Sequence, residues 1–142
     1  MENIEASNFK RLIGIWKTEG TILTNNDNSK LIGTDSYEFI LQGNYILHKA
    51  DVKMGNELSQ TFEIISLDNS TQKGKMHYYN SKNESGVMTC SLIAHNFKIV
   101  GDKIKFEGII NDDDTELTGK WFLEEENGIW IDFIDIKLTK QV

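Results

Sequence analysis

The chain has 142 residues, and we expect residues 1–142 to form one domain with its own core. A formal net charge of −7 and a pI near 4.9 argue against nucleic acid or an anionic membrane as a partner, because both bind basic surfaces. The single cysteine excludes an internal disulfide. The N-terminus is acidic without an apolar run, and no segment has the length of a membrane span, so we expect a cytoplasmic protein.

The chain opens with a short helical segment that leads into a strand. Apolar residues three to four apart predict one or two helical turns over Ser7–Leu12, with Ser7 or Asn8 as the N-cap. From Gly14 the hydrophobic period changes to two, so Trp16 shares one face of a strand with small residues. We expect this strand to coil around the end of a barrel that the helical segment closes beneath Trp16.

Short strands separated by turns fill the rest of the chain. Polar residues at Asn25–Ser29 predict a turn, and Asn127–Gly128 predicts a type I′ hairpin turn. The ten predicted strands are approximately Ile13–Leu23, Leu31–Leu41, Tyr45–Lys53, Leu58–Leu67, Lys75–Asn80, Val87–Asn96, Phe97–Val100, Lys103–Ile110, Thr115–Glu125 and Ile129–Leu138. Their even spacing and short turns favour a meander over a Greek-key sandwich.

Closure of this sheet follows from its exposed edges. An open ten-stranded meander would leave two edges as templates for aggregation, and a closed sheet removes both. The predicted fold class is therefore all-β, a single antiparallel up-and-down β-barrel of about ten strands with a short N-terminal helical segment. Eight strands already enclose room for one small ligand, and this chain is too short to fill a ten-stranded interior easily. The sequence therefore predicts an internal cavity.

Three stretches carry a resemblance to known barrels. Gly14-Ile15-Trp16 after a helical segment resembles the Gly-x-Trp signature of the lipocalins and other calycin barrels. Ile40–Leu47, and Ser66–Asp68 followed by His77–Ser81, resemble a bacterial lipocalin-like family of unknown function. The resemblance implies a barrel that binds a small hydrophobic molecule. Lipocalins usually place an arginine of the last strand against the signature tryptophan, and here the last strand offers Lys137 instead.

Aromatic residues recur at positions that can face the barrel interior, where they would suit an apolar ligand or form an ordinary core. The predicted ligand-binding residues are Trp16, Tyr37, Phe39, Phe62, His77, Tyr79 and Trp121. Asp35, two residues before Tyr37, would also face inward. The parity of the fifth strand stays open, because Met76 and Tyr78 could face inward instead and leave His77 exposed.

Catalytic and metal-binding motifs are absent from the sequence, and we expect no cofactor and no metal. None of the three histidines lies in the last two strands, where related barrels carry a haem ligand. Whether the protein is an enzyme stays open. One alternative to ligand binding is a cofactor-independent lyase or isomerase, with His77 as a base near Asp35 or Glu63. Another is a scaffold or interaction module that forms a homodimer.

Overall fold

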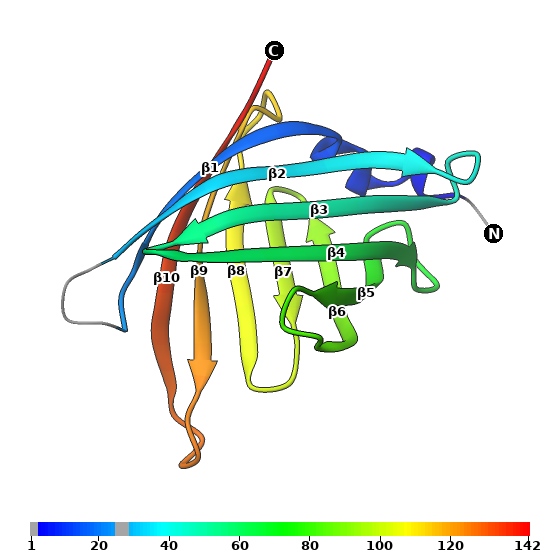
Figure 1. Ribbon diagram of the computed structural model, residues 1–142. Coiled ribbons are helices and arrows are strands. Elements are labelled where there is room, and N and C mark those ends of the chain that lie inside the picture. Colours follow the sequence, from blue (N-terminus) through cyan, green and yellow to red (C-terminus); the bar gives the residue numbers. More distant parts are fainter. Residues whose placement is uncertain (1–2, 25–28) are drawn as a thin grey trace.

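The computed structural model of the chain describes residues 3–24 and 29–142. In this part of the chain, ten antiparallel strands close into one barrel, in which each strand pairs with its sequence neighbours and β1 pairs with β10 (Figure 1). The strands are β1 (Gly14–Ile22), β2 (Lys30–Ile40), β3 (Tyr45–Met54), β4 (Glu57–Leu67), β5 (Lys73–Asn80), β6 (Ser85–Ile93), β7 (Asn96–Val100), β8 (Ile104–Ile110), β9 (Glu116–Glu124) and β10 (Trp130–Lys140). The predicted all-β up-and-down barrel is confirmed.

Two short 3-10 helices, η1 (Ile4–Ala6) and η2 (Asn8–Leu12), close one end of the barrel. Ser7 is the N-cap of η2, and its hydroxyl accepts a hydrogen bond of 3.1 Å from the backbone N–H of Phe9. The side chains of Phe9 and Leu12 are fully buried in the main core cluster. The side chain of Asn8 links η2 to β6, since its Nδ2 donates a hydrogen bond of 3.0 Å to the carbonyl of Leu92.

Trp16 lies directly above this N-terminal segment, as the sequence predicted. Its Nε1 donates to the carbonyl of Leu12 over 2.8 Å, and the side chain is fully buried. The cation against its ring is Lys140, whose Nζ lies 4.8 Å from the ring centre. The expectation that Lys137 takes this place is wrong, because the β1–β10 register pairs Trp16 with Lys140 and Lys137 with Glu19 on the outer face.

The turn between β9 and β10 also differs from its prediction. Five residues separate the two strands, and the N–H of Gly128 donates to the carbonyl of Glu125 over 2.9 Å. Gly128 has a positive φ of 81° but Asn127 does not, so the predicted type I′ turn, which needs both, is wrong. The other predicted turn, Asn25–Ser29, lies almost entirely outside the described residues.

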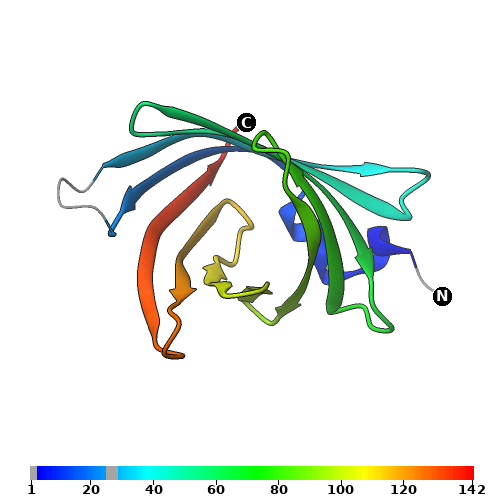
Figure 2. The same cartoon turned by 60° about the horizontal axis from the view of Figure 1, so that its bottom comes forward.

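The core is concentrated at the closed end of the barrel. The main cluster of buried residues joins the N-terminal segment to the inner faces of the strands around Trp16, Ile46 and Ile65. Figure 2 shows the strands arranged as a ring, with the N-terminal segment behind the green strands at one side of it. Other members of the cluster, among them Phe106 and Leu117, line the cavity described below.

Candidate functional site

A cavity of about 450 Å³ occupies the barrel interior, and its two walls differ in character. Every residue that β7–β10 and the turns between them contribute to its lining is apolar. These residues are Phe97, Ile99, Ile104, Phe106, Leu117, Trp121, Phe133, Ile134, Ile136 and Leu138. Two of these residues, Phe133 and Ile134, lie at a β-bulge of β10 between Asp132 and Ile134. This wall suits an apolar molecule.

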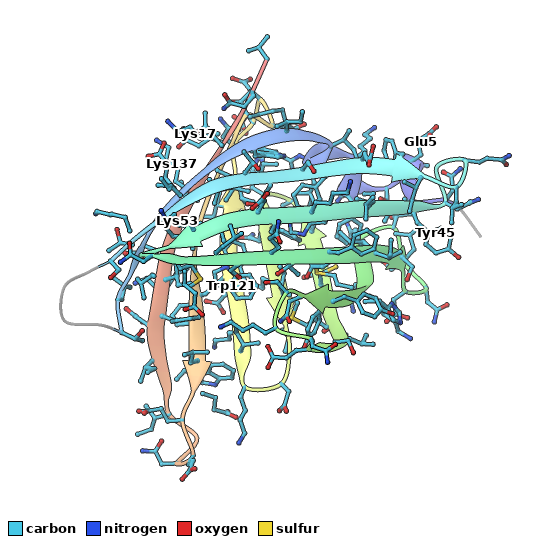
Figure 3. All side chains as sticks on the ribbon, in the orientation of Figure 1. Glu5, Lys17, Tyr45, Lys53, Trp121 and Lys137 are labelled. Carbon is cyan, nitrogen blue, oxygen red and sulfur yellow. The ribbon has the colours of Figure 1, made fainter. Side chains whose placement is uncertain are left out.

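The facing wall, from β2 to β5 and the loop after β5, supplies the polar lining. Ser59, Thr61 and Asn80 lie along it, and it reaches the exposed Lys82 and Glu84 in the loop between β5 and β6. The cavity therefore reaches the surface at the end opposite the N-terminal segment. Figure 3 shows Trp121 just below β4 in the view, near β8 and β9.

A cluster of three ionisable side chains lies in the polar wall, deep in the cavity. Asp35 of β2, His48 of β3 and Glu63 of β4 have exposed fractions of only 7%, 8% and 4%. His48 Nε2 lies 2.6 Å from Oδ1 of Asp35, and His48 Nδ1 is hydrogen-bonded to Oε1 of Glu63. Both nitrogens of the imidazole are therefore bound to carboxyl groups.

Two neighbouring residues hold this cluster in place. The hydroxyl of Thr18 on β1 donates a hydrogen bond to Oδ2 of Asp35, and Thr18 is fully buried. The ring of Tyr37 stacks on the imidazole of His48, with ring centres 4.1 Å apart and planes 1° from parallel. The strand register explains the arrangement, because Tyr37, His48 and Glu63 pair across β2, β3 and β4 in one row.

The carboxyl groups decide the charge of His48. Burial by itself lowers the pKa of His48, but Glu63 and Asp35 together raise it to about 10. The imidazole is therefore protonated at neutral pH. The pKa of Tyr37 is well above its usual value because of burial and then the nearby Asp35 and Glu63, so its phenol stays neutral. Burial also raises the pKa of Cys90 to about 12, which leaves an unreactive thiol.

Four of the predicted binding residues lie inside the barrel, but only two of these line the cavity. Tyr37 and Trp121 are lining residues. Trp16 is sealed in the core at the closed end, and Phe39 packs against the same cluster. Trp16 and Phe39 therefore belong to the core of the barrel and do not line the cavity.

The other three predicted residues lie on the outer face. Phe62, His77 and Tyr79 are exposed, Phe62 by 42% and Tyr79 by 57%, and the first and last pair across β4 and β5. Their predicted inward orientation is wrong. In β5 it is Met76 and Tyr78 that face the interior, which is the alternative left open by the sequence. The enzyme hypothesis in its His77 form therefore loses its base.

His48 was not predicted as a site residue, and Glu63 was considered only as a neighbour of His77. The inward orientation of both residues can be found from the strand pairing. Once Tyr37 faces inward, its partner His48 must do so, and the partner of His48 in turn is Glu63. Glu63 follows Phe62 in the chain. Hydrophobicity alone predicts that Phe62 faces inward, whereas in the structure Glu63 does.

Two structural features are absent from residues 3–24 and 29–142, a cluster of metal ligands and a helix that could span a membrane. No group of three or more histidine, cysteine, aspartate or glutamate side chains in that part of the chain is placed to hold a metal ion. Those residues also form no helix with the length and apolar character needed to cross a membrane.

Comparison with known proteins gives a fold neighbour but no family. No family model matches the chain, and no curated protein matches it in sequence. Among solved structures, the chain is similar to Rv2717c from M. tuberculosis, with a TM-score of 0.71 at 9% sequence identity. The match covers 94% of this chain and 95% of that one. At this identity the likeness supports the barrel fold alone.

Proposed function

We propose that this protein is a lipocalin-like barrel that binds a small, largely hydrophobic molecule in its interior. The observation that carries the proposal is the cavity of about 450 Å³ with an uninterrupted apolar wall from β7–β10. Its volume falls within the range of about 300–1,000 Å³ that is usual for small-molecule sites. Burial of apolar ligand surface against this wall supplies the free energy of binding, and the polar wall orients the ligand.

Native mass spectrometry tests this proposal on protein purified without denaturation. We expect a reproducible additional mass, or binding of an added apolar dye that changes the tryptophan fluorescence of the protein. In the variant Ala50→Trp a large side chain enters the cavity, because Ala50 belongs to its lining. The control, Asp51→Trp, places the same side chain on the exposed face of β3. Equal binding by these two variants would contradict an interior site.

A second function, a cofactor-independent lyase or isomerase, is favoured by one observation. The ionisable cluster and the Tyr37 hydroxyl belong to the cavity lining, where a carboxylate could take a proton and a phenol could donate one. His48 cannot act as the base at neutral pH, since it is already protonated and both nitrogens are bound. Glu63 is then the candidate base in place of His77.

Metabolite profiling separates the two functions. If the protein is an enzyme, incubation with a small-molecule extract will convert one compound into an isomer or into fragments, and Glu63→Gln will abolish this conversion. If the protein only binds, a compound will be retained unchanged by the wild type. Retention of an unaltered compound without any conversion would therefore contradict the enzyme.

A further inference from the structure

Two polar atoms deep in the cavity have no hydrogen-bond partner among the described residues. The only hydrogen bond of the Glu63 carboxyl group in the described chain joins its Oε1 to His48. Neither Oε2 of Glu63 nor Oη of Tyr37 has a side-chain hydrogen bond within residues 3–24 and 29–142. In the same part of the chain, no fully enclosed side-chain nitrogen or oxygen atom lacks a partner. Both atoms must therefore face open space, which for residues 4% and 5% exposed is the cavity they line.

The charge around these two atoms is acidic. One imidazolium stands against two carboxyl groups, so the cluster carries a net negative charge when both are ionised. Because both nitrogens of His48 are already bound to Asp35 and Glu63, the imidazolium has no donor left for a ligand. Burial, and after it the nearby Asp35 and Glu63, raise the pKa of the Tyr37 hydroxyl.

Among the described residues that line the cavity, no other cation lies beside the cluster. Arg11, the only arginine, lies at the closed end, where its Nε is 2.6 Å from Oδ1 of Asp114. Besides His48, Lys82 is the only cationic residue among the described residues that line the cavity. Its side chain is 60% exposed at the mouth of the cavity, near Glu57. A ligand carboxylate, sulfate or phosphate would therefore meet no free positive charge deep in the cavity.

We propose that the barrel takes a cationic amphiphile, an alkyl or aryl amine, whose ammonium group donates hydrogen bonds to Oε2 of Glu63 and Oη of Tyr37. The apolar part of this ligand lies along the wall formed by β7–β10. This inference rests on the proposed function and adds the class of head group. It follows from the acceptors left open, because an ammonium group pairs with a buried carboxylate and a carboxylate group would be repelled by it.

Calorimetric titration at neutral pH and high salt tests the head group with three probes of equal chain length: decylamine, decanol and decanoic acid. High salt suppresses attraction to the acidic outer surface. We expect decylamine to bind at least about ten-fold more tightly than decanoic acid, with decanol between them. Decanoic acid binding as tightly as decylamine would overturn the inference and leave the proposed function standing. Failure of all three probes to bind would contradict both.

Two variants assign the effect to the cluster. Glu63→Gln should weaken decylamine at least about ten-fold and leave decanol within about two-fold, because only the amine loses an ion pair with the carboxylate. Glu38→Gln is the matched control, since it removes the same charge from an exposed position on β2. Equal decylamine affinity in folded Glu63→Gln and wild type would overturn the inference.

Tyr37→Phe serves if the Glu63 variant does not fold, because it keeps the ring that stacks on His48 and loses only the hydroxyl. We expect this variant to weaken decylamine a few-fold more than it weakens decanol, because the ammonium group loses a charge-assisted hydrogen bond and decanol loses a neutral one. If decylamine and decanol are affected equally, the hydroxyl does not bind the head group and the inference fails.

Discussion

At the scale of single residues, His48 couples the stability of the barrel to pH. Its pKa in the folded chain is raised from 6.5 to about 10, so its ion pairs stabilise the fold fully below about pH 6.5. This stabilisation is lost as the pH rises through about 10. We therefore expect the free energy of unfolding in urea to fall between these two pH values. Nitrogen NMR should show an imidazole of His48 that keeps both protons at about pH 8, and loss of a proton near pH 6.5 would contradict this.

Thr18 is the second residue with a defined energetic role in the cluster. Its buried hydroxyl is the donor to Oδ2 of Asp35, and Thr18→Val removes this donor with little change of shape. The expected loss is about 1–3 kcal/mol in the free energy of unfolding, because a buried carboxyl oxygen is left unpaired. Thr34→Val, at an exposed position of β2, is the control and should change stability by less than about 0.5 kcal/mol.

At the scale of elements, the close pairing of β2 and β3 depends on Gly33. A Cβ atom at this position would lie 2.1 Å from the carbonyl oxygen of Asp51 and 2.6 Å from Cα of Val52. Both are backbone atoms that cannot move without separating the strands, so we expect Gly33→Ala to cost about 3 kcal/mol or more in urea unfolding. Because β2 and β3 carry Asp35 and His48, this variant should also disturb the cavity.

Gly128 supplies the comparison at the same scale. It has a positive φ of 81°, and a Cβ there would meet no atom within 4 Å. Gly128→Ala should therefore cost only the strain of a left-handed residue, about 1–2 kcal/mol. A Gly33→Ala protein as stable as Gly128→Ala would show that the contact between β2 and β3 relaxes easily.

At the scale of the whole molecule, Arg11 fixes the N-terminal segment to the barrel. Besides Asp114, its guanidinium group donates to the carbonyl of Ala94 over 2.7 Å and of Asn111 over 3.1 Å, which joins η2 to two loops of the closed end. Arg11→Met should cost about 1.5–3 kcal/mol and speed amide hydrogen exchange in η2 and both loops. Lys17→Met is the control, because the side chain of Lys17 is 62% exposed. Unchanged exchange in η2 would contradict the role of Arg11.

The sequence by itself determined the barrel and the closed end. Alternation within β1 and β2 identified the inner faces with Trp16 and Tyr37, and the change of period at Gly14 located the end of the helical segment. These features are local, because they depend only on hydrophobic spacing within one element. The unpaired edges of a meander then required closure, whatever the order of its side chains.

Only the tertiary structure decided what the barrel encloses. The parity of β4 and β5 follows from cross-strand pairing, which runs from Tyr37 through His48 to Glu63 and from Glu63 to Tyr78. A charged residue is placed inside only when partners meet it there. Glu63 lies inside because the pairing of β2, β3 and β4 brings His48 and Asp35 to it, and the bonds of His48 to both carboxyl groups offset a burial that hydrophobicity alone would forbid.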